Sequence, residues 1–229
     1  MKKVRLLQIE FENEIAAYEI PAFRGAIVKI SGKENTLFHN HKNDKLLYKY
    51  PLIQYKRNNK KPMIVCIEEG VDEVHHFFEK KQIGILLGER QYELKIAKLN
   101  MNQFTMQVWD KSFRYYLRNW LALNQKNYND YNKIANEIEQ IEFLEKILTG
   151  NILSFAKGIN WQLEKQIKLR ISEISDKKII KIKNTQRDAF SLVFTSNVFL
   201  PNYIGLGKNA SLGFGVVKQI NKNNEHGKS

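Results

Sequence analysis

Residues 4–12 read VRLLQIEFE and set the fold expected for the first half of the chain. Leu7, Ile9 and Phe11 alternate with glutamine and glutamate, which is the two-residue period of a β-strand with one buried face. This strand begins the pattern, and the segments after it decide which kind of sheet it joins.

A helix and two further strands are expected next. Residues 20–32, IPAFRGAIVKISG, predict a helix, because Pro21 suits a first helical turn and Gly32 can end a helix. Strand-like runs at 45–56 and 62–69 flank the polar RNNKK, which predicts a hairpin. A second short helix is expected in VDEVHHFFEKK, and further strands in IGILLG and YELKIAKLNMNQFTMQVW. The order strand, helix, strand, strand, helix, strand is that of a ferredoxin-like unit.

A helical segment is expected after this unit, from Lys111 to Leu148. Its apolar residues recur every three or four positions and therefore form one stripe along a helix, with asparagine, glutamate and lysine opposite. The stripe comprises Tyr131, Ile134, Ile138, Ile141, Leu144 and Leu148. After Gly150 the strand period returns in IKLRISEI, KIIKIK and DAFSLVFTS and, beyond a glycine-rich segment, in FGVVKQI. Both halves are therefore expected to be antiparallel and rich in sheet.

These patterns divide the chain into three parts and predict an α+β fold. Residues 1–109 form an N-terminal ferredoxin-like domain, and residues 110–220 combine the helical segment with a second sheet-rich domain. Residues 221–229 form a polar tail that we expect to be disordered.

The charge of the chain indicates a polyanionic partner. Lys and Arg number 37 against 24 Asp and Glu, which gives a formal charge of +13. Such an excess attracts phosphates and releases their counterions, although a generally lysine-rich proteome would give the same count. The single cysteine, Cys66, can form neither an intramolecular disulfide nor a thiolate cluster. No apolar run is long enough to cross a bilayer and the N-terminus does not resemble a signal peptide, so we expect a cytoplasmic protein without membrane contact.

The glycine-rich stretch GLGKNASLGFG, residues 205–215, is a candidate phosphate-binding loop. Glycines let backbone N–H groups approach a phosphate, and a lysine in the same loop adds positive charge. It is not a Walker loop, and too little chain follows it for a dinucleotide-binding βαβ unit. The alternative is a glycine-rich hairpin without a ligand. The candidate RNA-binding residues here are Gly205, Gly207, Lys208, Asn209, Ser211, Gly213 and Gly215.

Two histidines, His39 and His41, stand one residue apart in the polar stretch TLFHNHKNDKLLYKYPLIQYK, residues 36–56. Metal binding is the weaker interpretation, because HNHKND lacks the final histidine of the binuclear zinc hydrolase motif. His75 and His76 add little, because neighbours on a predicted helix point about 100 degrees apart. No metal and no cofactor are expected.

Acid–base work on RNA suits the histidine pair better, because an imidazole can act as base in one form and as acid in the other. The base would take the proton of a ribose 2′-OH, whose oxygen attacks the adjacent phosphorus, and an acid would protonate the departing 5′-oxygen. Tyr48 could orient the hydroxyl or donate a proton, and Lys45, Lys49 or Lys56 could neutralise charge in the transition state. Lys49 and Lys56 are also candidate RNA-binding residues. The alternative for these lysines is a solvated strand face, and for the tyrosines it is sheet packing.

Several motifs together resemble one known family, the CRISPR repeat-processing endoribonucleases called Cas6. GLGKNASLGFGVV, preceded by LPNYI, resembles the glycine-rich loop of that family. RGAIV, LFHNH, YKYPLIQYK, WLALNQKNY and LTGNILSFAKGI resemble its b-type branch, and the similarity extends over most of residues 1–220.

The resemblance implies two tandem ferredoxin-like, or RRM-like, domains and cleavage of precursor CRISPR RNA without metal. The products implied are a 2′,3′-cyclic phosphate and a 5′-hydroxyl, and the partners are CRISPR repeat RNA, as precursor and as mature crRNA. His39 and His41 would lie at the catalytic centre with Tyr48 nearby, and the assisting lysine would be Lys29, Lys33 or Lys45. RNA would contact the glycine-rich loop.

A homodimer and association with a CRISPR interference complex are further arrangements that the resemblance raises. The rival hypothesis for the activity is a noncatalytic RNA-binding subunit of such a complex. Intact His39 and His41 favour the enzyme over this rival.

Overall fold

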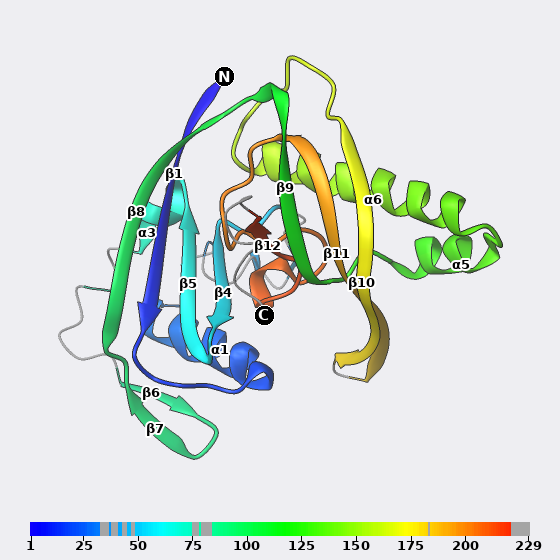
Figure 1. Cartoon of the computed structure of the whole chain (residues 1–229). Coiled ribbons are helices and arrows are strands. Elements are labelled where there is room, and N and C mark those ends of the chain that lie inside the picture. The colour runs from blue at the N-terminus through cyan, green and yellow to red at the C-terminus, as the bar shows by residue number, and fades with distance from the viewer. Residues whose placement is uncertain are drawn as a thin grey trace, which may run out of the picture.

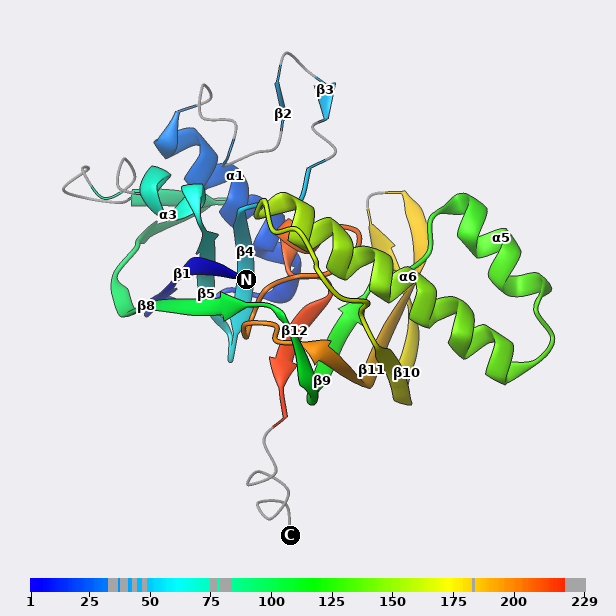
Figure 2. The same cartoon turned by 90° about the horizontal axis from the view of Figure 1, so that it is seen from above.

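The protein is described here by a computed structural model that covers residues 1–32, 37, 41–42, 45–46, 49–74, 78, 84–182 and 184–220. Two antiparallel four-stranded sheets stand side by side (Figure 1). Helices from both halves lie on one side of the two sheets (Figure 2). The first sheet leads into the second at Gln107, between β8 and β9. The predicted tail, residues 221–229, lies outside the described residues.

The first sheet has the strand order β4-β5-β1-β8, and each neighbouring pair is antiparallel. In chain order this is second, third, first, fourth, which is the ferredoxin-like arrangement expected from the sequence. Its strands and helices are β1 (Lys2–Phe11), α1 (Ile20–Ser31), β4 (Ile53–Asn58), β5 (Lys61–Ile67), α3 (Glu69–Glu73) and β8 (Ile96–Met106). A 3-10 turn, η1 (Ala17–Glu19), precedes α1.

Two small hairpins stand outside this sheet. The strand expected in IGILLG is β6 (Gly84–Leu87), and it pairs with β7 (Arg90–Glu93) instead of joining the sheet. In the α1–β4 connection, β2 (His41–Lys42) pairs with β3 (Lys45–Leu46). The predicted turn RNNKK does join β4 to β5, and Asn59 and Lys60 have the positive φ values that a tight hairpin turn requires.

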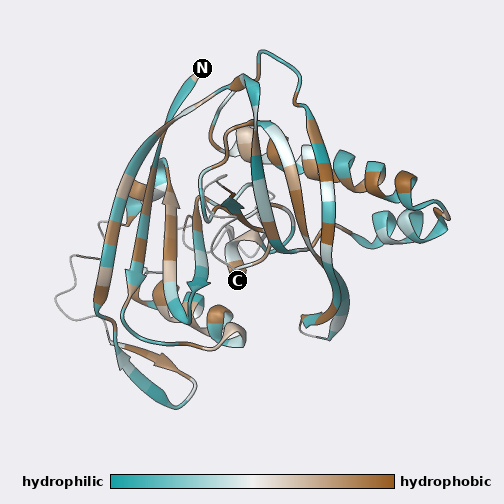
Figure 3. Cartoon of the chain, viewed as in Figure 1, coloured by the Kyte–Doolittle hydropathy of each residue, from teal (hydrophilic) through white to brown (hydrophobic). Residues whose placement is uncertain are grey.

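The strand β1 is buried on both faces, whereas the sequence predicted only one buried face. Ile9 and Phe11 lie in a core beneath α1, whereas Val4 and Leu6 belong to a core shared with the second half of the chain. The second buried face exists because the other half packs on it. Figure 3 shows apolar and polar residues alternating along the strands of both sheets.

The second sheet has the order β10-β11-β9-β12, again second, third, first, fourth in chain order. A glycine-rich connection, residues 199–215, stands where a ferredoxin-like unit has its second helix, and contains only the 3-10 turn η2 (Ala210–Leu212). The other elements are β9 (Val108–Trp120), α5 (Gln125–Lys133), α6 (Glu137–Gly158), β10 (Leu169–Ile182), β11 (Thr185–Val198) and β12 (Val216–Gln219).

The helical prediction from Lys111 was wrong for the residues up to Trp120, which form β9. The helices begin at Gln125 and lie inside the second unit, between β9 and β10. The apolar stripe is divided between two helices. Tyr131 of α5 is buried, Ile138 in the first turn of α6 is exposed, and Leu144 and Leu148 of α6 are buried again. The two predicted runs IKLRISEI and KIIKIK form one long strand, β10.

The shared core joins the two units into one body. It contains Val65 of β5 and Leu117 of β9, together with Leu148 and Phe155 of α6. Cys66 is buried in the separate core beneath α1. In the described part of the chain, no helix is long and apolar enough to cross a membrane.

Candidate functional site

The glycine-rich connection forms a closed loop on the end of β9. Its two ends pair with each other. Leu206 N–H donates to the Gly215 carbonyl at 2.8 Å, and Gly205 forms an isolated antiparallel β-bridge with Val216. Lys208 N–H donates to the Leu121 carbonyl at 3.3 Å. Backbone groups of the loop are therefore engaged within the protein.

Two of the glycines are required by close packing. Gly207 has φ +81°, and a Cβ there would lie 2.6 Å from the Trp120 indole nitrogen. Gly215 has φ +58°, and a Cβ there would lie 1.9 Å from the Leu206 carbonyl oxygen. Both positions combine a left-handed backbone with a contact that leaves no room for a side chain. The glycine pattern therefore has a structural cause, whatever else the loop binds.

Buried side chains of the first unit hold this loop from below. Tyr50 Oη donates to the Gly205 carbonyl at 2.8 Å, and Gly205 N–H donates to Gln54 Oε1 at 2.8 Å. Gln54 Nε2 in turn donates to Tyr50 Oη at 2.9 Å. Burial raises the pKa of the Tyr50 hydroxyl, so it stays protonated and able to donate. Because both polar groups of Gly205 are satisfied by β4 and the residues just before it, the loop is fixed to the other unit.

Lys56 is buried beneath the same loop, which revises its predicted role as an RNA contact. Its side chain is fully inaccessible, and Nζ donates to the Ala210 carbonyl at 2.5 Å. Burial, with a smaller contribution from Arg118, lowers the pKa of Lys56 to about 7. The alternative interpretation, a solvated strand face, does not hold either, because the loop covers this face of β4. Lys56 supports the loop from inside.

Other predicted RNA-binding residues reach the surface. Lys208 is exposed at the loop. Its pKa is lowered mainly by partial burial and further by the positive charge of Arg187 nearby. Asn209 takes the left-handed conformation at φ +54° and leads into η2, where Ser211 is partly exposed. Lys49 is exposed just before Tyr50. The loop therefore presents a cationic outer side above its buried supports.

The predicted catalytic residues lie in the α1–β4 connection. The register of the β2–β3 hairpin pairs His41 with Leu46 and Lys42 with Lys45, so the backbone brings His41 and Lys45 onto adjacent strands. In Figure 2 this hairpin projects from the side of the molecule that carries α1 and α6. His39 and Tyr48 lie outside the described residues. Among the residues that are described, no three His, Cys, Asp or Glu side chains group as metal ligands.

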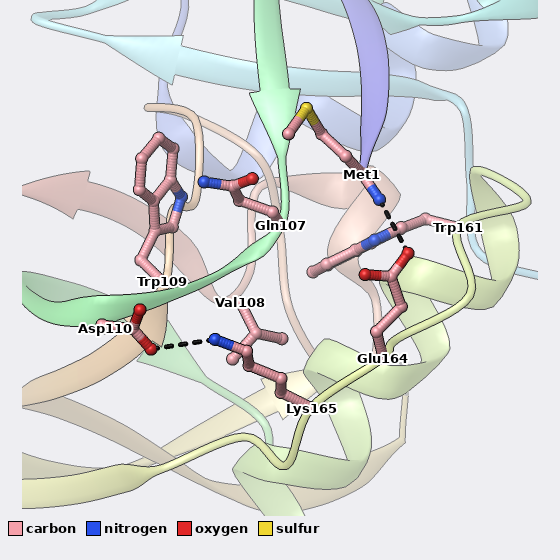
Figure 4. A pocket seen from close by; sticks show the side chains of 8 residues that line it. All are labelled: Met1, Gln107, Val108, Trp109, Asp110, Trp161, Glu164 and Lys165. Atoms are coloured by element: carbon pink, nitrogen blue, oxygen red, sulfur yellow. Dashed lines mark hydrogen bonds and ion pairs between the residues drawn. The ribbon is translucent and has the colours of Figure 1, made fainter.

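A separate cavity of about 310 Å³ lies where β8 passes into β9 (Figure 4). Its carboxylates are paired, because Glu164 contacts the Met1 amino group at 3.2 Å and Asp110 contacts Lys165 at 3.0 Å. None of the predicted catalytic or RNA-binding residues lines it. Its walls are Met1, Gln107, Val108, Trp109, Asp110, Trp161, Glu164 and Lys165.

The residues that sequence reasoning missed are the buried supports of the loop, Tyr50 and Gln54. A signal was present, because Tyr50 belongs to the same YKYP motif as Tyr48. Spacing within one segment could not show that this tyrosine reaches a loop 155 residues further along the chain.

The fold and the loop define a class of protein with two ferredoxin-like units in tandem and a glycine-rich connection that closes the second. The chain belongs to the Cas6b family. The family model of the Cas6b N-terminal domain matches residues 2–105, and that of the Cas6b C-terminal domain matches residues 107–220.

Known proteins support this membership. A crystal structure of a Cas6b has a TM-score of 0.87 and 27% identity, covering 96% of this chain and 100% of that chain. A second, described as the CRISPR RNA processing endoribonuclease Cas6b, has a TM-score of 0.73 at the same identity and coverage. The uncharacterized protein MJ0978 of Methanocaldococcus jannaschii is 34% identical over 146 residues, which are 59% of this chain and 97% of that protein.

Proposed function

We propose that this protein is a metal-independent endoribonuclease that cuts the repeat of precursor CRISPR RNA in the cytoplasm. Membership of the Cas6b family supports this, as does the similarity to a Cas6b described as a CRISPR RNA processing endoribonuclease. The charge of +13 suits a nucleic-acid substrate.

One structural observation carries the proposal: the histidine segment leads directly into the residues that hold the glycine-rich loop. From Leu46 to Tyr50 the chain can span at most roughly 14 Å. His41 is paired with Leu46, and Tyr50 is hydrogen-bonded to Gly205. Loop and hairpin are therefore close enough for one RNA strand of a few nucleotides to contact both.

The proposed chemistry uses the histidine pair as base and acid. One imidazole of His39 and His41 removes the proton of the 2′-OH, and the resulting oxygen attacks the adjacent phosphorus. The bond to the 5′-oxygen breaks, and the other imidazole supplies the proton that this oxygen needs. The products are a 2′,3′-cyclic phosphate and a 5′-hydroxyl. Tyr48 orients the hydroxyl, and Lys45 offsets the charge that develops on the phosphate oxygens.

Binding is assigned to different residues. Lys49 and Lys208 contact phosphates, together with the exposed parts of Asn209 and Ser211. Lys56 holds the loop in shape and does not touch RNA.

The test is cleavage of a labelled repeat RNA by the purified protein in excess EDTA. We expect cleavage to continue, and we expect an RNA with one 2′-deoxy sugar just upstream of the scissile phosphate to bind normally and stay intact. Cleavage that requires added zinc or magnesium would overturn the metal-independent mechanism, and cutting of the 2′-deoxy RNA would overturn attack by the 2′-hydroxyl. Tight binding without any cleavage would indicate a noncatalytic RNA-binding subunit.

A further inference from the structure

The first sheet ends at a long edge strand, β8, which lies at the border farther from the second sheet (Figure 1). Within the described residues, β8 pairs with β1 alone, and no other backbone hydrogen bond reaches Ile96–Met106. A bulge at residues 96–98 leaves a regular stretch from Lys98 onward. This stretch offers unpaired N–H and C=O groups, which are a template for another strand.

Two of the other sheet edges are closed by the protein itself. The glycine-rich connection lies against β4, where a Cβ at Gly213 would be 3.7 Å from the Tyr55 carbonyl oxygen. On β12, Tyr203 N–H donates to the Val217 carbonyl at 2.8 Å, and Val217 N–H donates to the Ile204 carbonyl at 3.0 Å. Another strand therefore has no room to pair at these positions.

The remaining edge, β10, differs from β8 in its charge. It carries Lys177, Lys178 and Lys181, and lysines along an edge oppose pairing with another chain. In contrast, β8 contains a single charged residue, Lys98, and neither proline nor glycine. Among the edges of the two four-stranded sheets, β8 is therefore the one suited to pairing.

The exposed side chains of β8 are apolar on the face that carries α1. Leu99 and Met101 lie opposite Ile9 and Leu7 of β1, and Ile9 belongs to the core beneath α1. Leu99 is 54% exposed and Met101 is 52% exposed. The apolar face of the sheet therefore continues beyond its helix layer, up to the open edge.

A two-fold axis through Asn100 makes this edge complementary to itself. When two copies of a strand pair antiparallel about an axis perpendicular to the sheet, both copies keep the same face on the same side. Leu99 of each copy then lies directly across from Met101 of the other, which gives two apolar cross-strand pairs. The pairing covers residues 98–102 and ends where the bulge begins.

The same register avoids opposing like charges. Lys98 of each copy lies across from Asn102 of the other, so the cation of the strand meets a neutral amide. An axis through Lys98 would instead place two lysines across from each other, which is destabilising. An axis through Leu99 or Met101 would give one apolar pair in place of two. Charge and apolar pairing therefore both favour the axis through Asn100.

We propose that two copies of this chain pair through β8, antiparallel and centred on Asn100, so that their first sheets form one continuous sheet. The interface uses the same surface on both copies and closes on itself, which limits the assembly to a dimer. Leu99 and Met101 of both copies fill the strip between the two helix layers. Pairing of this kind needs no RNA, so it does not rest on the proposed function.

Sedimentation equilibrium of the purified, RNA-free protein from about 1 to 200 µM tests the proposal, because the mass of a dimer depends on protomer concentration. The mass should rise from one chain towards two. Met101→Lys should raise the dissociation constant at least about tenfold, because it places a charge across from an apolar side chain. The variant should still fold, since Met101 is half exposed in the single chain, and circular dichroism checks this.

Ile179→Lys is the matched control. Ile179 is also an exposed apolar residue on an edge strand, 67% exposed on β10, and the substitution adds the same charge. It should leave the dissociation constant unchanged. Equal weakening by the two variants would mean that only net charge matters, and would overturn the proposal. A single-chain mass at the highest concentration would also overturn it, as would a dimer that Met101→Lys leaves intact.

Cysteine pairing tests the register. Asn100→Cys places two thiols directly across the axis, where paired Cα atoms are about 4.5–5.5 Å apart and a disulfide can form. Mild oxidation should link this variant. It should not link Asn102→Cys, whose two copies lie roughly 13 Å apart along the strands. The native Cys66 is buried and common to both variants. Linking of Asn102→Cys equal to that of Asn100→Cys would overturn the register. Because RNA is absent throughout, failure of these tests leaves the proposed function untouched.

Discussion

At the scale of the residue, the histidine pair concerns the proposed chemistry, and the buried Lys56 concerns how the glycine-rich loop is held in place. The pair accounts for the proposed chemistry, and its residue types already favoured acid–base work on RNA. Lys56 shows where sequence reasoning failed, because it was predicted to contact RNA, with a solvated strand face as the alternative, and it is buried. The covering loop comes from the other end of the chain, so no local pattern could show that Lys56 is buried.

His41→Ala should leave RNA bound and lower the rate of single-turnover cleavage by about 10² to 10⁴, the usual worth of a positioned proton-transfer group. His39→Ala should lose rate too, and the double variant should lose less than the product of the two single losses, because groups that act as one unit are not additive. Rates measured at saturating protein distinguish a slower chemical step from weaker RNA binding. An unchanged rate in both single variants would exclude the pair from the chemistry.

Lys56→Met should change how stability depends on pH. The pKa of Lys56 is about 7 in the folded protein and 10.5 ordinarily, so between these values the unfolded chain binds the additional proton. Stability of the unaltered protein should therefore rise with pH across this window relative to the variant, by at most about 1.4 kcal/mol per pH unit. Urea unfolding at pH 7, 8.5 and 10 measures the difference, with exposed Lys49→Met as control. Parallel curves would mean that Lys56 is charged when buried.

At the scale of the element, periodicity predicted most strands and helices but placed one boundary wrongly. Phe113, Tyr115 and Leu117 have the two-residue spacing of a strand, yet the strong helical spacing that follows was extended backward over them. The glycine-rich connection was recognised, but its tight packing was not. The sequence shows that glycines are present, but it does not show which atoms a side chain in their place would clash with.

Gly207→Ala should destabilise the protein by about 2–4 kcal/mol, from a left-handed alanine and from overpacking against Trp120. It should also weaken RNA binding, because Lys208 is the next residue. Gly25→Ala is the matched control, since it lies in α1 with open space around its Cβ position and should be neutral or slightly stabilising. Thermal melts followed by RNA titration compare the two. Equal melting temperatures would show that the loop can shift to admit a methyl group.

At the scale of the whole molecule, the order of elements was sufficient to predict a ferredoxin-like first half. How the two halves meet was not predictable, because the shared core uses residues such as Val4 and Leu6 whose partners lie across the chain. The glycine-rich connection adds polar contacts to the same junction through Tyr50 and Gln54. Both kinds of contact couple the two units.

We therefore expect the units to unfold together. The three tryptophans, Trp109, Trp120 and Trp161, all lie in the second unit, so their fluorescence reports on it, whereas far-ultraviolet circular dichroism reports on both. The two signals should give one urea transition with the same midpoint. Tyr50→Phe should lower that midpoint for both signals, because leaving the Gly205 carbonyl unsatisfied lowers the free energy of unfolding by about 1–3 kcal/mol. Separate midpoints would show that each unit is stable alone.

The position of β12 has a consequence for synthesis on the ribosome. This strand ends at Gln219, and it pairs with β9, which was made about a hundred residues earlier. The loop that covers Lys56 and Gln54 also lies in this last stretch, so these two polar side chains remain uncovered until the loop has been synthesised. The first unit can form its own sheet early, but the shared core on one face of that sheet is incomplete until the last stretch of the chain, which supplies Ile204, Leu206 and Val217, has left the exit tunnel. A ribosome that stalls before this point would hold a nascent chain whose shared core is not fully covered, and exposed apolar surface of this kind is what chaperones bind.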